Sequence, residues 1–94
     1  MASHDVQIRA LGEFAPTAEL ISAVGDRLDE TPGLIDPILS ADARARVIEL
    51  SVEVEAADAG DAHRRAADAL GAALVGAGVT VGWTVADRGR ALIG

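Results

Sequence analysis

Apolar and polar residues alternate most regularly between residues 47 and 56. Every second position here is apolar: Ile48, Leu50, Val52, Val54 and Ala56. The positions between them are mostly polar or acidic: Val47, Glu49, Ser51, Glu53 and Glu55. A period of two is typical of a strand that buries one face. The segment therefore predicts a long strand with one apolar face and one acidic face.

Three further segments predict strands. Residues 6–10 and 79–85 alternate in the same way, although more briefly. Residues 34–39 are apolar but contain Pro37, which cannot donate a hydrogen bond to a neighbouring strand. We therefore expect this third segment at an edge of the sheet, and a hairpin loop over residues 40–43.

Two segments have the helical period. After Pro16, which suits the first turn of a helix, Leu20, Val24 and Leu28 fall on one stripe. Asp58 is placed to cap the second helix. The inward stripe of that helix is mostly alanine: Ala62, Ala66, Ala69, Leu70, Ala73, Leu74 and Ala77. Because alanine is small, we expect this helix to pack closely on the sheet and to leave no large cavity.

The order strand-helix-strand-strand-helix-strand predicts an α+β fold, the ferredoxin-like βαββαβ sandwich. We expect a four-stranded antiparallel sheet in the order 4-1-3-2 with two helices on one face, in a single domain over residues 1–94 with a tail at 88–94. From right-handed crossovers we also expect the first and third strands to lie side by side and to run parallel. The predicted core is Val6, Ile8, Leu20, Val24, Leu28, Ile48, Leu50, Val52, Val54, Ala66, Leu70, Ala73, Leu74, Val81 and Trp83.

The charge and composition of the chain exclude several classes of partner and site. Fifteen acidic and eight basic residues give a formal net charge of −7, and such a field repels nucleic-acid backbones and anionic lipid. The absence of cysteine excludes disulfides, thiolate metal sites and a cysteine nucleophile. No apolar segment resembles a signal peptide or a membrane span. We therefore expect a small acidic cytoplasmic protein with no nucleic-acid or membrane partner.

The open face of the predicted sheet holds the main candidate residues. Glu49, Glu53 and Glu55 share this face, and Arg9 is placed to pair with Glu49 or Glu53. Carboxylate clusters can transfer protons or hold a hard cation, although a solvated polar face is the simpler interpretation. The candidate ligand or partner face is Gln7, Arg9, Glu49, Ser51, Glu53, Thr80 and Thr84.

Metal and anion sites are less strongly indicated. His63 has no second ligand one turn away, and Ala2-Ser3-His4 could enclose Cu(II) or Ni(II) only with a free N-terminal amine. We expect no metal and no cofactor. One grouping of arginines could bind an anion: Arg44 and Arg46 with Arg88 and Arg90. Two pairs on the second predicted helix are spaced for ion pairs: Asp61 with Arg65, and Arg64 with Asp68.

Residues 47–58, followed by Ala62, Ala66, Ala69 and Leu70, resemble a group of small uncharacterised actinobacterial proteins with a ferredoxin-like pattern. This resemblance covers roughly the second half of the chain. The architecture is also similar to ACT regulatory domains and to dimeric α+β-barrel proteins, but the ligand residues of neither family can be matched. An RNA-recognition sheet is excluded because the predicted central strands carry no aromatic residue.

These observations favour a small non-enzymatic binding or regulatory module that recognises a protein partner or a small ligand. No convincing pair of nucleophile and base is present. We expect a homodimer, formed through the open face or the edge of the fourth strand, with a monomer as the alternative. The alternative function is a cofactor-free enzyme of the dimeric α+β-barrel type, with a cavity between sheet and helices that uses Trp83, His63 and Arg9.

Overall fold

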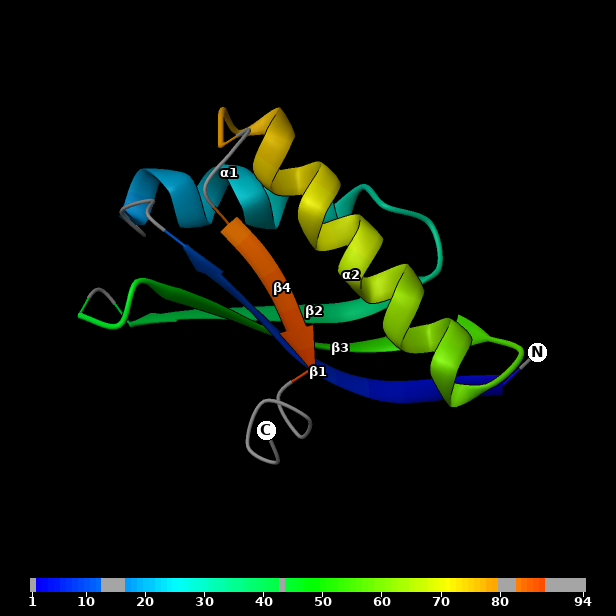
Figure 1. Cartoon of the computed structure of the whole chain (residues 1–94). Coiled ribbons are helices and arrows are strands. Elements are labelled where there is room, and N and C mark those ends of the chain that lie inside the picture. The colour runs from blue at the N-terminus through cyan, green and yellow to red at the C-terminus, as the bar shows by residue number, and fades with distance from the viewer. Residues whose placement is uncertain (1, 13–16, 43, 80–82, 88–94) are drawn as a thin grey trace.

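The computed structural model describes residues 2–12, 17–42, 44–79 and 83–87 of the chain. Along the sequence these residues form β1 (Ala2–Gly12), α1 (Ala18–Asp29), β2 (Leu34–Asp42), β3 (Val47–Ala56), α2 (Ala59–Gly76) and β4 (Trp83–Asp87). Both helices lie on the same face of the sheet (Figure 1). The predicted α+β class, with two helices and an antiparallel sheet, is confirmed. None of the described helices is long and apolar enough to cross a membrane.

β3 lies between β2 and β1 and is antiparallel to both. Val6 pairs with Val52 and Ile8 with Leu50, so the apolar sides of β1 and β3 face the helices together. The backbone of β4 pairs antiparallel with the other side of β1. The prediction that the first and third strands run parallel was wrong. The α1 crossover returns the chain in the direction of β1, and the hairpin after β2 then reverses it, so β3 opposes β1.

β2 is an edge strand, as Pro37 predicted, but it extends further than expected. Residues 40–42, predicted as a hairpin loop, continue the ladder as far as the pair Asp42 and Val47. The Oδ1 atom of Asp42 accepts hydrogen bonds from the backbone N–H groups of Arg44, at 3.0 Å, and Ala45, at 3.2 Å. These hydrogen bonds close the turn after Asp42, whereas the sequence predicted that the loop begins at Ser40.

The ladder between β2 and β3 is irregular near the start of β2. The register shifts between Ile35 and Ile38, and Asp36 in the interval has a φ of 50°. Such a shift is a β-bulge, which bends the strand and leaves a residue unpaired. Pro37 can occupy this position because no ladder hydrogen bond is required of it there.

Side chains cap both helices at their N-termini. The Oγ1 atom of Thr17 accepts a hydrogen bond from the Leu20 N–H, so α1 begins at Ala18. Pro16, expected in the first turn, lies outside the described residues. The Oδ1 atom of Asp58 accepts a hydrogen bond from the Asp61 N–H at 2.8 Å, which confirms Asp58 as the cap of α2.

The core lies between the sheet and the two helices. It comprises Val6, Ile8, Ala10, Val24, Leu28, Ile48, Leu50, Val52, Val54, Ala56, Ala62, Ala66, Leu70, Ala73 and Leu74. Leu20, predicted in the core, is half-buried against it, while Val81 and the side chain of Trp83 lie outside the described residues. Val47 was predicted on the polar face but is only 6% exposed. It stands on an inner strand, where its neighbours Leu11 and Asp42 flank it on both sides.

Candidate functional site

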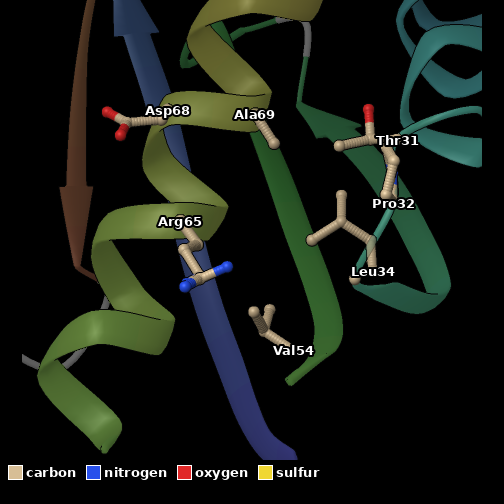
Figure 2. Close-up of a pocket in the computed structure, with 8 residues that line it drawn as sticks. Thr31, Pro32, Leu34, Val54, Arg65, Asp68 and Ala69 are labelled. Atoms are coloured by element: carbon tan, nitrogen blue, oxygen red, sulfur yellow. The ribbon is translucent and has the colours of Figure 1, made fainter. Parts of the chain in front are cut away.

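A pocket of about 330 Å³ lies between α2 and the loop that joins α1 to β2 (Figure 2). It is lined by Thr31, Pro32, Gly33, Leu34, Val54, Arg65, Asp68 and Ala69. These residues come from three parts of the fold: the loop and the start of β2, the inner strand β3, and one face of α2. The site is therefore assembled by the tertiary structure rather than by a sequence motif.

The loop forms one wall and is tied to both of its neighbours. The Thr31 N–H donates to the Leu28 carbonyl at 3.1 Å, and the Thr31 hydroxyl donates to the Arg27 carbonyl at 2.8 Å, so Thr31 continues the end of α1. Gly33 takes a φ of 85°, and its carbonyl accepts a hydrogen bond from the Glu55 N–H at 3.1 Å. Pro32, between these two anchors, has a restricted φ. The wall is held in place at both ends.

The floor of the pocket and the part of its α2 wall formed by Ala69 are apolar. Val54 of β3 is almost completely buried and forms the floor, and Leu34 is half-buried beside it. Ala69 contributes only a methyl group from α2, and this leaves space where a larger side chain would reach the loop (Figure 2). An apolar group of a ligand would be removed from water here.

Arg65 supplies the positive charge at this site, and Asp61 holds it in place. The Nε atom of Arg65 donates to Oδ2 of Asp61 at 2.9 Å, one turn back along α2. The guanidinium of Arg64 donates to the other carboxylate oxygen. Two hydrogen bonds lower the pKa of Asp61 to about 2: the one from Arg64 has the larger effect, and the one from Arg65 the smaller. The same contact with Asp61 raises the pKa of Arg64.

The hydrogen bonds of Arg65 leave it able to bind a further anion. One carboxylate, Asp61, is shared by two guanidinium groups, so these three residues together carry a net charge of +1. Within the described part of the chain, the structure places only Nε of Arg65 in a hydrogen bond. The carboxylate of Asp68 points away from Thr31, Pro32 and Leu34 on the opposite wall (Figure 2).

This pocket of about 330 Å³ contradicts the expectation that the alanine-rich helix leaves no large cavity. The inward stripe of α2 does pack closely, since Ala62, Ala66 and Leu70 are fully buried. The space opens at the edge of that stripe, where Ala69 faces the loop. The sequence did not reveal the site, because no local signal in Thr31-Pro32-Gly33 shows that this turn stands opposite α2.

The predicted ligand or partner face lies on the side of the sheet away from the helices. In the ladder, Gln7 stands opposite Ser51 and Arg9 stands opposite Glu49. A small hollow of about 70 Å³ in this region is lined by Gln7, Ile8, Ile38, Ser40, Glu49, Leu50 and Ser51. Glu53 stands opposite Asp5. Thr80 lies outside the described residues, and Thr84 is described only by its backbone, which pairs with Leu11. A role for this face stays a prediction.

The two histidines do not come together. The Nδ1 atom of His63 lies 2.8 Å from the Ala59 carbonyl within α2. His4 lies in the extended strand β1, opposite Val54, and its Nε2 atom is buried without a hydrogen-bond partner in the described structure. In this conformation the backbone of residues 2–4 pairs with β3 and does not wrap around a common centre. Among the described residues, no group of three histidine or acidic side chains is arranged to hold a metal ion.

The predicted ion pairs on α2 form in part. Asp61 and Arg65 pair as expected, but Arg64 binds Asp61 three residues back instead of Asp68. Of the suggested anion-binding arginines, Arg44 and Arg46 are exposed around the β2–β3 turn. Arg88 and Arg90 lie outside the described residues, so that grouping stays a prediction.

A comparison of the chain with protein-family models, curated proteins and solved structures finds no match. The function is therefore argued from the geometry of the pocket.

Proposed function

We propose that this protein is a non-enzymatic binding module that takes a small ligand in the pocket between α2 and the α1–β2 loop. The pocket itself is the observation that carries the proposal. Its volume of about 330 Å³ is at the lower end of the range for small-molecule sites. Its composition, an apolar floor with two charged groups, Arg65 and Asp68, at the side, is also typical of such sites.

The enzyme alternative finds less support. It uses Trp83, His63 and Arg9 in one cavity. The side chain of Trp83 lies outside the described residues. Arg9 alternates with buried Ile8 and Ala10 and so faces away from the helices, whereas His63 stands on α2. Of the polar groups that line the pocket, the Thr31 hydroxyl already donates to a carbonyl, and Asp68 points away (Figure 2). This arrangement places no nucleophile beside a base.

We propose, further, that the fold is the complete ferredoxin-like sandwich with the strand order 4-1-3-2. The antiparallel pairing of the β4 backbone with β1 supports this order. The position of both helices on one face supports the sandwich (Figure 1).

A homodimer is the partner that we propose. The described helices cover one face of the sheet, so the opposite face or the β4 edge can receive a second copy (Figure 1). Asp5, Glu49 and Glu53 on that face favour a hydrated contact over a dry one. Light scattering at high concentration should give twice the mass of 9.6 kDa. A mass of one chain would contradict the dimer and would leave the pocket proposal untouched.

Ala69→Leu tests the binding function. The larger side chain fills the pocket from α2, while Ala72→Leu on the exposed side of the same helix is the matched control. Each protein is incubated with a cell extract and washed, and the retained small molecules are identified by mass spectrometry. We expect a compound that the unaltered protein and Ala72→Leu retain and that Ala69→Leu loses. Retention of the same compounds by all three proteins, or of none, contradicts the proposal.

A further inference from the structure

We infer that the ligand of this pocket is a small monocarboxylate with a compact aliphatic body. This inference rests on the proposed function, because it names the chemical class of the ligand for the same site. It follows from three properties of the lining: its single cation, the hydrogen-bond donors that this cation has left, and the apolar floor.

Arg65 is the one cationic residue among the eight that line the pocket. Its Nε atom is already bonded to Asp61, which fixes the plane of the guanidinium and leaves the two terminal amino groups. A guanidinium binds a carboxylate through two parallel N–H···O bonds, and the two terminal amino groups suffice for this. The position of Arg65 thus fits a planar anion with two oxygens.

The number of charges favours a single negative charge on the ligand. Arg65 brings one positive charge to the lining and Asp68 one negative charge, so the pocket can compensate at most a single negative charge on a ligand. A phosphate dianion would carry a second negative charge that the pocket does not compensate, and a protein with a net charge of −7 repels that charge. The Asp68 carboxylate, on the next turn of α2, adds to that repulsion.

The lining residues other than Arg65 favour an aliphatic group as the uncharged part of the ligand. Val54, Leu34 and Ala69 offer aliphatic surface, and the volume of about 330 Å³ restricts the ligand to a small molecule. The Thr31 hydroxyl, which bonds to Arg27, has its one proton already engaged. A ligand with several hydroxyl groups would lose water on this floor without gaining hydrogen bonds in return.

The test compares three probes by amide NMR shifts at Gly33 and Ala69, which lie on opposite walls. The probes are hexanoate, its uncharged amide hexanamide, and inorganic phosphate. We expect hexanoate to shift both signals and to bind about tenfold more tightly than hexanamide, because only hexanoate carries a negative charge and can form an ion pair with the guanidinium of Arg65. Phosphate should not shift Ala69 at the same concentration. Hexanamide binding as tightly as hexanoate, or phosphate binding more tightly, would overturn the inference.

Two variants assign the effect to one side chain. Arg64 and Arg65 are neighbours that both bind Asp61, but only Arg65 lines the pocket. Arg65→Gln should weaken hexanoate binding about tenfold and leave hexanamide binding unchanged, and Arg64→Gln should preserve both. Equal losses in the two variants would mean that general charge, not Arg65, attracts the ligand. If none of the probes shifts either wall, and Ala69→Leu changes nothing in the extract experiment, the proposed function fails; if hexanamide alone binds, only the carboxylate assignment fails.

Discussion

Asp61 links the cap of α2 to the pocket, and its environment makes the stability of the protein depend on pH. Hydrogen bonds from Arg64 and Arg65 lower its pKa from 3.8 to about 2 in the folded protein. A group whose pKa is lower in the folded state contributes stability that is present above its ordinary pKa. This contribution is lost as the pH falls through the folded value.

The prediction concerns Asp61→Asn. The difference in unfolding free energy between the unaltered protein and this variant should be constant above about pH 5 and should shrink between about pH 4 and pH 2. Urea denaturation at a series of pH values measures it. A difference that does not change over this range would show that the carboxylate contributes no pH-dependent stability.

Two glycines predict opposite responses to the same substitution. Gly25 lies inside α1, and a Cβ there would meet the Leu39 Cδ1 atom at 3.6 Å, an ordinary contact. Gly25→Ala should therefore raise the unfolding free energy by about 0.5–1 kcal/mol through the higher helix propensity of alanine. Gly33 has a φ of 85° and open space around it, so Gly33→Ala should lower the unfolding free energy by about 1 kcal/mol through backbone strain alone. Urea denaturation of both variants should show these opposite signs, and a change of the same sign in both would contradict the assignment.

At the level of elements, α2 depends on its N-terminal cap. Asp58→Ala removes the acceptor of the Asp61 N–H and should cost about 1 kcal/mol of unfolding free energy. Asp58→Asn is the matched control, because asparagine caps a helix about as well as aspartate, and it should lose much less stability. Thermal denaturation followed by circular dichroism distinguishes the two variants. Equal losses would mean that the charge of Asp58, not its hydrogen bond, stabilises the helix.

The elements that sequence could predict are those with a strong period. The alternation over residues 47–56 predicted β3 correctly, because its apolar positions must all face one core. β2 was predicted too short because Ser40, Ala41 and Asp42 have the composition of a loop, while their pairing with β3 outweighs that preference. The pocket could not be predicted, since its two walls, Thr31–Leu34 and Arg65–Ala69, meet only through the packing of α2 on the sheet.

For the whole molecule, the topology predicts where resistance to local unfolding is greatest. β1 and β3 are the inner pair of the sheet, paired on both sides, and α2 packs on both of them. Amide hydrogen exchange should therefore be slowest in these two strands, at positions such as Val52, and faster in the edge strand β2. Stronger protection in β2 than in β1 and β3 would contradict this picture of the sheet.

The interrupted edge of β2 has a consequence for the homodimer proposed above. The bulge at Asp36 and Pro37 divides that edge into two short stretches, although Ile38 beside it is 66% exposed. An edge broken in this way is a poor template for an incoming strand, and natural sheets use proline and bulges to prevent fibre formation. Strand addition is then restricted to the opposite edge of the sheet. An assembly that uses one edge of each copy is complete with two molecules, so it closes as a pair and does not propagate as a filament.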